Sequence, residues 1–295
     1  MIFSEIRLIG LIAIGMLWTL NGLGQASYQP LEWGQVSETD RQMTVYEQEP
    51  SAQAVVLADE GRQTIWLNEN AAAEAFLRRH RRIKILQDGA IRKYGEIELF
   101  YYHGEGREQI INLRAQVIFG DGQMEPLAPD EIFVSELNEN WTKITLSFPN
   151  LQVGAIIEYQ YDHLSQYILA PDDWVFRDEI PVRSSYFRFL SLLPIYYNFV
   201  VKGTDHLSRE VLPDGRQRYY EGEMEFVVEN TTFWLKNAPS FQLESNMPGG
   251  DDYLLQFLSL QRVDCCARKT RCNGTGNKRS FHGIHPSVSL VMHRL

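Results

Sequence analysis

Apolar and polar residues alternate in short stretches along most of the chain, from residue 54 to residue 236. Alternation with a period of two is typical of a half-buried β-strand, because successive side chains point to opposite faces of a sheet. No helical pattern of useful length lies between these stretches, which argues against a parallel α/β fold. The pattern predicts a mainly β protein: an antiparallel β-sandwich or barrel-like sheet with few short helices. Strands are expected at 54–58, 63–67, 82–86, 97–102, 109–119, 141–148, 155–163, 186–189, 196–202, 207–212, 216–221, 224–228 and 233–236.

Turn chemistry separates many of the predicted strands. Residues 59–61 (Asp-Glu-Gly), 121–122 (Asp-Gly) and 213–215 (Pro-Asp-Gly) supply the residues that tight turns prefer. Ser37 is placed to cap a short helix that reaches Met43, because its hydroxyl can accept a hydrogen bond from a free backbone N–H.

Two stretches leave alternatives open. Residues 71–79 favour a helix by propensity, but they lead into the alternating stretch at 82–86, which we interpret as a strand. A linker bounded by prolines, residues 171–181, suggests two lobes that meet near residues 170–182; one continuous large sandwich is the alternative. A helical turn is expected within residues 126–134.

The N-terminus has the pattern of a secretory signal peptide. Arg7 precedes an apolar run at residues 8–20, and small residues at 24 and 26 favour cleavage after Ala26. The run has 13 residues, whereas a helix needs about 20 to span a bilayer. We therefore expect residues 1–26 to be a signal peptide, an uncleaved anchor being the alternative, and an exported domain with no membrane span after cleavage.

The composition changes near residue 262. Residues 263–295 hold six Lys or Arg against one Asp, and all three cysteines of the chain. Zinc binding by Cys265, Cys266, Cys272, His282 and His285 is one interpretation, although adjacent cysteines rarely chelate one ion well. We favour a tail that is disordered or out of frame.

Charge and motifs assign no chemistry. The net charge of −10 argues against nucleic-acid binding, which needs clustered cations. We assign no catalytic, cofactor-binding or metal-binding residue, expect no cofactor, and leave ligand-binding residues unknown. A calcium site or a glycosidase pair at the acidic pairs, 172–173, 178–179 and 251–252, is weighed against turn chemistry, which we favour. The basic cluster at 78–84 is interpreted as a solvated face or as partners for carboxylates.

Aromatic residues offer a second interpretation. The pairs at 101–102, 196–197 and 219–220, with Trp174 and Trp234, could stack on sugars or peptides. Neighbours on a strand point to opposite faces, so one residue of each pair is expected in the core.

Residues 148–161 (FPNLQVGAIIEYQY) and 174–182 (WVFRDEIPV) resemble the domain-of-unknown-function family 3857. Residues 54–61, 79–86 and 110–115 add further matches, and the resemblance covers about residues 33–260. Its members are exported proteins of Gram-negative bacteria, which implies a periplasmic or extracellular location. The domain usually precedes a transglutaminase-like catalytic domain, so the resemblance implies a β-sandwich without assigned chemistry that is truncated before that domain.

Three hypotheses follow for a domain at residues 27–262. The first is a non-catalytic exported module that serves packing or substrate presentation beside a missing downstream transglutaminase-like domain. The second is an independent binding domain for a glycan or a peptide, with Trp174 and Tyr197 as the residues to test. The third is a small hydrolase. We favour the first and do not expect an enzyme.

Overall fold

The computed structural model describes residues 30–68, 70, 72–169, 171–191, 196–202, 217–221, 224–241 and 256–262. The chain divides into two compact units, Met1–Glu32 and Trp33–Leu295. Only residues 30–32 of the first unit are described. The predicted signal peptide, strand 207–212, turn 213–215, acidic pair 251–252 and tail 263–295 lie outside the described residues.

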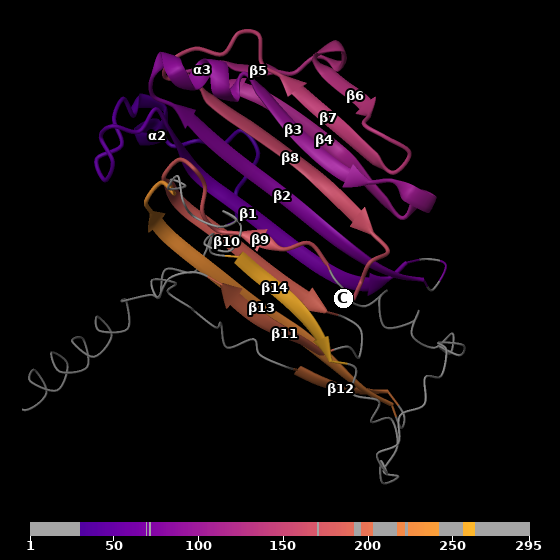
Figure 1. Cartoon of the computed structure of the whole chain (residues 1–295). Coiled ribbons are helices and arrows are strands. Elements are labelled where there is room, and N and C mark those ends of the chain that lie inside the picture. Colours follow the sequence, from indigo (N-terminus) through magenta and orange to yellow (C-terminus); the bar gives the residue numbers. More distant parts are fainter. Residues whose placement is uncertain are drawn as a thin grey trace, which may run out of the picture. The chain divides into compact units, whose positions relative to one another are not determined.

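Three β-sheets form the second unit, and the prediction of a mainly β protein with few short helices is confirmed (Figure 1). The large sheet has eight strands in the order β12-β13-β10-β1-β2-β8-β4-β5, and two three-stranded sheets have the orders β11-β14-β9 and β3-β7-β6. The strands are β1 (Ala54–Leu67), β2 (Ala73–Ile85), β3 (Glu96–Tyr102), β4 (Glu108–Ile118), β5 (Met124–Pro126), β6 (Ile132–Glu136), β7 (Trp141–Ser147), β8 (Ile156–Ser165), β9 (Trp174–Val175), β10 (Val182–Ser191), β11 (Tyr196–Lys202), β12 (Gln217–Glu221), β13 (Met224–Ala238) and β14 (Gln256–Arg262); the helices are α2 (Glu38–Gln42), α3 (Asp88–Tyr94) and the 3₁₀ turns η1 (Gly104–Gly106) and η2 (Pro129–Glu131).

One face of the large sheet forms the core with both small sheets. The registers align Val182, Val56, Ile83, Ile157 and Val117 in one row across five strands. These side chains belong to one buried cluster. Leu146 of β7, Trp174 of β9 and Tyr197 of β11 belong to the same cluster. We call this face of the large sheet the inner face.

The pairing is antiparallel throughout these sheets except for one parallel pair, β1 with β10. The strands on both sides of the linker at 171–181, β8 and β10, belong to the same large sheet. Residues 33–295 also form one compact unit. The linker therefore joins two strands of one sheet, an arrangement that fits the alternative of one continuous sandwich better than two lobes.

The expected turn at residues 59–61 is also wrong. β1 runs without interruption through Asp59, Glu60 and Gly61, and the hairpin turn lies further on, at Asn68, whose side chain accepts hydrogen bonds from the N–H groups of Asn70 and Ala72. Gly61 does not form a turn; it allows two aromatic rings to pack closely against the backbone of β1. A Cβ atom at this position would lie 2.7 Å from Trp174 Cε3 and 2.8 Å from Phe187 Cδ2.

Other elements differ in length or were missed. The helical propensity of residues 71–79 is overridden, since β2 pairs with β1 on one side and β8 on the other. The two strands expected at 224–228 and 233–236 are one strand, β13. Helix α3 and strands β5, β6, β9 and β14 were not predicted. The helical turn expected within residues 126–134 is confirmed as η2. The short helix after Ser37 is confirmed: the Asp40 N–H donates to Ser37 Oγ at 3.1 Å.

We expect Gly61→Ala to lower the free energy of unfolding by about 1–3 kcal/mol, because the added methyl group must displace two ring systems of a packed core. Gly120→Ala is the matched control, since the nearest atom to its Cβ would be a carbonyl oxygen at 3.8 Å. Urea denaturation measures both. Equal stability of the two variants would contradict the packing role of Gly61.

Candidate functional site

Two half-buried arginines of β2 lie on the inner face of the large sheet. Arg79 holds Asp59 of β1 with two hydrogen bonds, Nε to Oδ1 at 3.0 Å and Nη2 to Oδ2 at 2.6 Å. Arg81 lies 3.5 Å from the same carboxylate and is also ion-paired with Asp178 of the linker. Burial alone would raise the pKa of Asp178, but the Arg81 guanidinium and the backbone N–H groups of the next two residues outweigh it and lower that pKa. Asp178 is thus ionised, and both carboxylates are paired with an arginine.

Trp174 packs against these ion pairs of Arg79 and Arg81, which we call the inner network. Its ring lies 4.9 Å from the Arg79 guanidinium and stacks on Phe187 at 5.2 Å between centroids. Its Nε1 donates to Ser185 Oγ at 3.1 Å. The space that it occupies exists because Gly61 has no side chain. Three of the segments that carry the family resemblance, 54–61, 79–86 and 174–182, therefore meet in one cluster.

The opposite, outer face of the large sheet carries a second buried network. Glu158 of β8 is fully buried; its Oε1 is 2.8 Å from His80 Nε2 and accepts from Arg82 Nε at 2.7 Å, while its Oε2 accepts from Gln116 at 2.5 Å and from the Gly34 N–H at 3.0 Å. Burial would raise the pKa of this carboxyl, but His80, Arg82 and Gln116 lower it overall. Every lone pair of the carboxylate is directed at a donor.

Residues 33–37, which precede α2 and which we call the lead-in segment, cover these bonds around Glu158, the outer network. The Trp33 ring lies 5.6 Å from the His80 ring, and the Arg114 guanidinium lies 4.1 Å from Trp33. Lys84, next along the outer face, donates to the carbonyl oxygens of Arg41 and Gly154, both at 2.6 Å. Burial lowers the pKa of Lys84 to about 8. The polar atoms of this face are therefore matched by the sheet itself, by the lead-in segment, by helix α2 and by a residue shortly before β8.

A third cluster lies at the end of β8. His163 places Nδ1 2.5 Å from Asp172 and Nε2 3.4 Å from Glu108. Burial would lower the pKa of His163, but the two carboxylates raise it to about 9. Ser165 donates its hydroxyl to Glu108 at 2.9 Å. The arrangement holds an imidazolium between two acids.

This third cluster differs from a catalytic triad in its connections. A serine nucleophile needs a neutral histidine as its base, with a carboxylate behind that histidine. Here both nitrogens of His163 face carboxylates, and Ser165 bonds Glu108 instead of the histidine. The cluster can stabilise the fold, but it does not activate the hydroxyl of Ser165.

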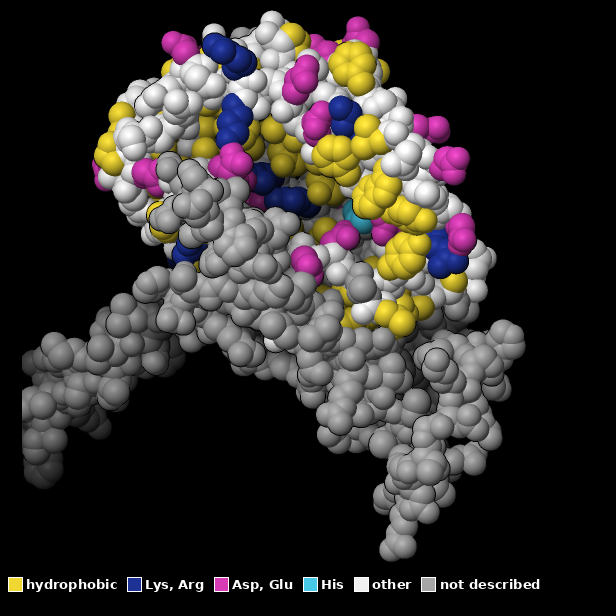
Figure 2. Space-filling model, in the orientation of Figure 1, with side chains coloured by type: hydrophobic (Ala, Val, Ile, Leu, Met, Phe, Trp, Pro, Cys, Tyr) yellow, Lys and Arg dark blue, Asp and Glu magenta, His cyan; other side chains and the backbone are white. Residues whose placement is uncertain are grey.

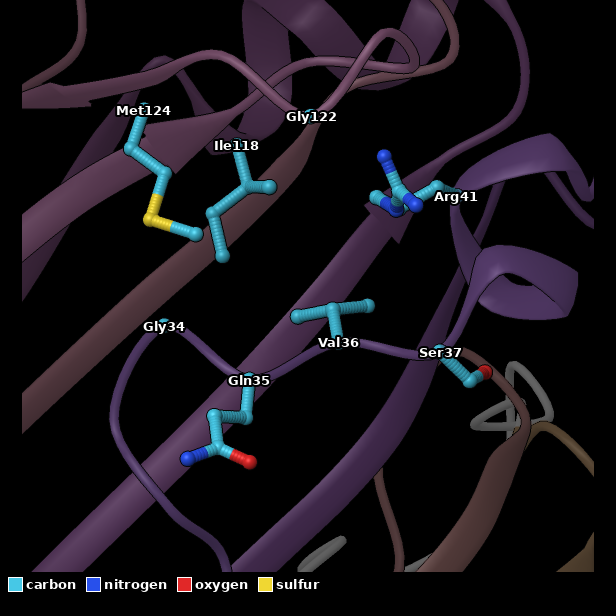
Figure 3. A pocket seen from close by; sticks show the side chains of 8 residues that line it. All are labelled: Gly34, Gln35, Val36, Ser37, Arg41, Ile118, Gly122 and Met124. Carbon is cyan, nitrogen blue, oxygen red and sulfur yellow. The ribbon is translucent and has the colours of Figure 1, made fainter.

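A pocket of about 590 Å³ lies between the lead-in segment and the β4–β5 hairpin (Figure 3). Val36, Ile118 and Met124 point into it, and Arg41 stands at one end. The lining offers apolar contact and one cation, without a paired acid and base. Its residues are Gly34, Gln35, Val36, Ser37, Arg41, Ile118, Gly122 and Met124.

Hydrophobic side chains also gather on the surface. In Figure 2 they lie in and beside a hollow of the described surface, next to Lys and Arg side chains. The face of the β3-β7-β6 sheet that points away from the core exposes Phe100 and Trp141, at 50% and 43%. Tyr102 lies edge-on to Trp141 at 5.6 Å, and Tyr167 is 6.1 Å from Tyr102. We call these four residues the aromatic face.

The structure decides between the interpretations of the charged motifs. The basic cluster at 78–84 pairs with carboxylates and is mostly not a solvated face, since its charged groups meet Asp162, Asp59, Asp178 and Glu158. Turn chemistry holds for Asp178, which accepts from two backbone N–H groups, but its bond to Arg81 was missed. The described residues include no group of three or more His, Cys, Asp or Glu arranged to hold a metal ion.

The two aromatic residues proposed for ligand binding are buried. Trp174 is part of the inner network, and Tyr197 donates its hydroxyl to the carbonyl of Ile168 at 2.8 Å inside the core. Trp234 is half-buried and donates to Ser184. The pair at 101–102 splits as expected, with Tyr102 on the aromatic face. Side chains of 196, 219 and 220 lie outside the described residues.

Comparison with known proteins identifies the family. The profile described as "Domain of Unknown Function with solved-structure structure (DUF3857)" matches residues 76–224, half of the chain. The chain belongs to this family, as the resemblance predicted. No curated protein matches the sequence.

None of the helices among the described residues has the length and apolar content to cross a bilayer.

Two solved structures are similar to the chain. A protein of Parabacteroides distasonis described as a "putative protease" has 12% identity and a TM-score of 0.54, over 70% of this chain and 40% of that protein. This likeness supports the fold alone, and the chain spans 40% of the length of that protein. A "putative nutrient binding protein" of Legionella pneumophila has 9% identity and a TM-score of 0.26, over 71% of this chain and 67% of that one; a similarity this low carries no argument.

The His163 cluster predicts a specific loss of stability in alkali. The folded pKa of about 9 lies above the ordinary histidine value of 6.5. The charged imidazolium therefore stabilises the fold fully below pH 6.5, and this contribution disappears as the pH rises through 9. Its size is on the order of 3 kcal/mol. We expect the difference in unfolding free energy between wild type and His163→Gln to shrink by that amount from pH 6.5 to pH 10. Lys84 also titrates in this range, but it does so in both proteins and cancels. A difference that is constant with pH would contradict the prediction.

Proposed function

We propose that residues 27–262 are a non-catalytic, exported β-sandwich module, the N-terminal part of a transglutaminase-like protein, and that the module serves packing or substrate presentation beside a catalytic domain. The observation that carries this proposal is the similar fold within a longer protein: the chain spans 40% of a protein described as a "putative protease". Export is supported by the signal-peptide pattern at residues 1–26.

The chemistry of the described clusters supports the same proposal. Asp59, Asp178 and Glu158 each face a guanidinium, and His163 is held between two acids. A general base or nucleophile has to be available to a substrate. In these clusters the acids and bases are already engaged with one another, as structural ion pairs are.

The coding DNA around the end of this chain tests the proposal. We expect one of the other two reading frames beyond residue 262 to encode more β-sandwich and then a transglutaminase-like domain with its Cys, His and Asp. If neither frame encodes such a continuation, the truncated-module proposal fails. Hydrolase activity of the full chain that Ser165→Ala or His163→Gln abolishes would also overturn it.

A second candidate function is binding of a glycan or a peptide, and the aromatic face favours it. The exposed rings of Phe100 and Trp141 and the half-buried ring of Tyr102 lie on one face of a sheet, and amphipathic rings suit stacking on sugars. Trp174 and Tyr197 have no part in this candidate, because they are buried.

We expect Trp141→Ala to abolish any glycan binding that the full chain shows on a glycan array, without lowering the unfolding free energy by more than about 1 kcal/mol, because the indole is largely exposed. Val45→Ala, another exposed apolar residue, is the matched control. Binding that survives Trp141→Ala would remove the aromatic face as the site.

A further inference from the structure

Strand β6 is an edge strand, and its free side lacks the proline, lysine or bulge that would hinder pairing with another strand. It is the last strand of the β3-β7-β6 sheet, and in the described part of the chain only β7 pairs with it. Natural edge strands are usually blunted by proline, lysine or a bulge. The edge of the large sheet follows this rule, because β5 has only three residues and ends in Pro126. The sequence of β6, Ile-Phe-Val-Ser-Glu, contains neither proline nor lysine.

The backbone groups that face this free side can be assigned. The Leu137 N–H donates to the carbonyl of Trp141 at 2.8 Å, and this bond continues the β6–β7 register. Hydrogen-bonded and non-bonded pairs alternate in an antiparallel ladder, so Phe133 and Ser135 also bond β7. The N–H and C=O groups of Val134 and Glu136 therefore point away from the sheet. The Ile132 N–H, which points the same way, is already bound to the carbonyl of Pro129.

Apolar side chains are exposed on both faces of this strand. Val134 lies opposite Ile144, a buried residue of the core face, yet Val134 is 65% exposed. The core face of the small sheet is thus uncovered at its last strand. Phe133, on the other face, is 55% exposed, and Leu137 just beyond the strand is 51% exposed. A further strand beside β6 would bury these side chains and extend the existing core.

The acidic residues around β6 indicate which charge such an added strand would carry. Between Arg114 and Lys143 the sequence has six acids and no Lys, Arg or His. None of the six forms an ion pair with another described residue. A cationic strand would gain attraction and an anionic one repulsion. The six are Asp121, Glu125, Asp130, Glu131, Glu136 and Glu139.

We propose that β6 is a docking edge for an extended segment of another polypeptide, with alternating apolar residues and basic ends, which adds to the β3-β7-β6 sheet as a fourth strand. Backbone hydrogen bonds from Val134 and Glu136 hold the segment, Val134 and Phe133 contact its apolar side chains, and the acids at the two ends of β6 select its charge. The edge uses none of the four residues of the aromatic face, although Phe133 projects from the same side of the sheet. The inference does not depend on the proposed function.

The test uses the full chain and a synthetic peptide, acetyl-Lys-Val-Thr-Val-Thr-Val-Lys-amide, followed by fluorescence anisotropy of a labelled form at low salt. We expect binding that weakens at least about tenfold when both lysines are replaced by glutamate. In hydrogen exchange, the peptide should slow the amides of Val134 and Glu136 and leave those of Phe133 and Ser135, which already bond β7, unchanged. No binding at millimolar peptide, or equal binding of the two peptides, would overturn the proposal.

Val134→Pro isolates the edge, because it removes an outward N–H and leaves the β6–β7 ladder complete. The matched control is Glu98→Pro, which removes an outward N–H from β3, at the opposite edge of the same sheet. We expect at least about tenfold weaker binding for the first variant and unchanged binding for the second. Equal loss in both variants, or a concentration-dependent dimer of this chain that Val134→Pro abolishes, would overturn the assignment of β6 to another polypeptide. If Val134→Pro does not fold, the exchange pattern of the wild type decides.

Discussion

The sandwich depends on the pairing of two arginines between its layers. Arg79 and Arg81 project from the central strand β2 on the inner face, where only 25% and 12% of their side chains are exposed. An unpaired charge with so little access to water would destabilise the fold. Asp59 from the neighbouring strand and Asp178 from the linker neutralise them. A register slip of one residue would bring other members of the basic cluster to the inner face, but it would turn the buried apolar residues of β2 away from the core. The apolar pattern therefore specifies the β1–β2 register, and the ion pairs connect the linker to the sheet.

The outer face of the same strand imposes a second requirement. His80 and Arg82 converge on the buried Glu158, so the large sheet has a charged centre on both faces. Water would enter a polar face left open, and the network is instead covered by Trp33 and bonded by the Gly34 N–H. The lead-in segment is therefore a structural part of the unit, although the family match begins only at residue 76.

Sequence periodicity predicted most strands. It failed where contacts between segments distant in the sequence determine the local structure. Strands 196–202 and 141–147 were placed to within a residue, because alternation reports directly on one covered face. The Asp-Glu-Gly of residues 59–61 has turn composition, but its aspartate pairs with Arg79 and its glycine makes room for Trp174. Those partners come from other strands and cannot be read from the local sequence. Strand β6 was missed altogether, since a helical turn was the only element expected near it, within residues 126–134. Even a predicted strand would not have revealed the exposed edge, because alternation does not show whether both sides of a strand are paired.

The segments that identify the family explain the fold better than they explain a function. Residues 54–61, 79–86 and 174–182 meet in the inner network, where their charges neutralise one another and their rings pack. A functional surface needs the opposite conditions: accessible side chains and unused bonding capacity. In the described part of the chain those conditions are met around residues 121–142, which belong to none of the segments that carry the resemblance. Val134 there exposes a side chain of the core face, beside acids without a cationic partner. A partner strand of the kind proposed would therefore contact this short region, while the family segments maintain the sheet that presents it.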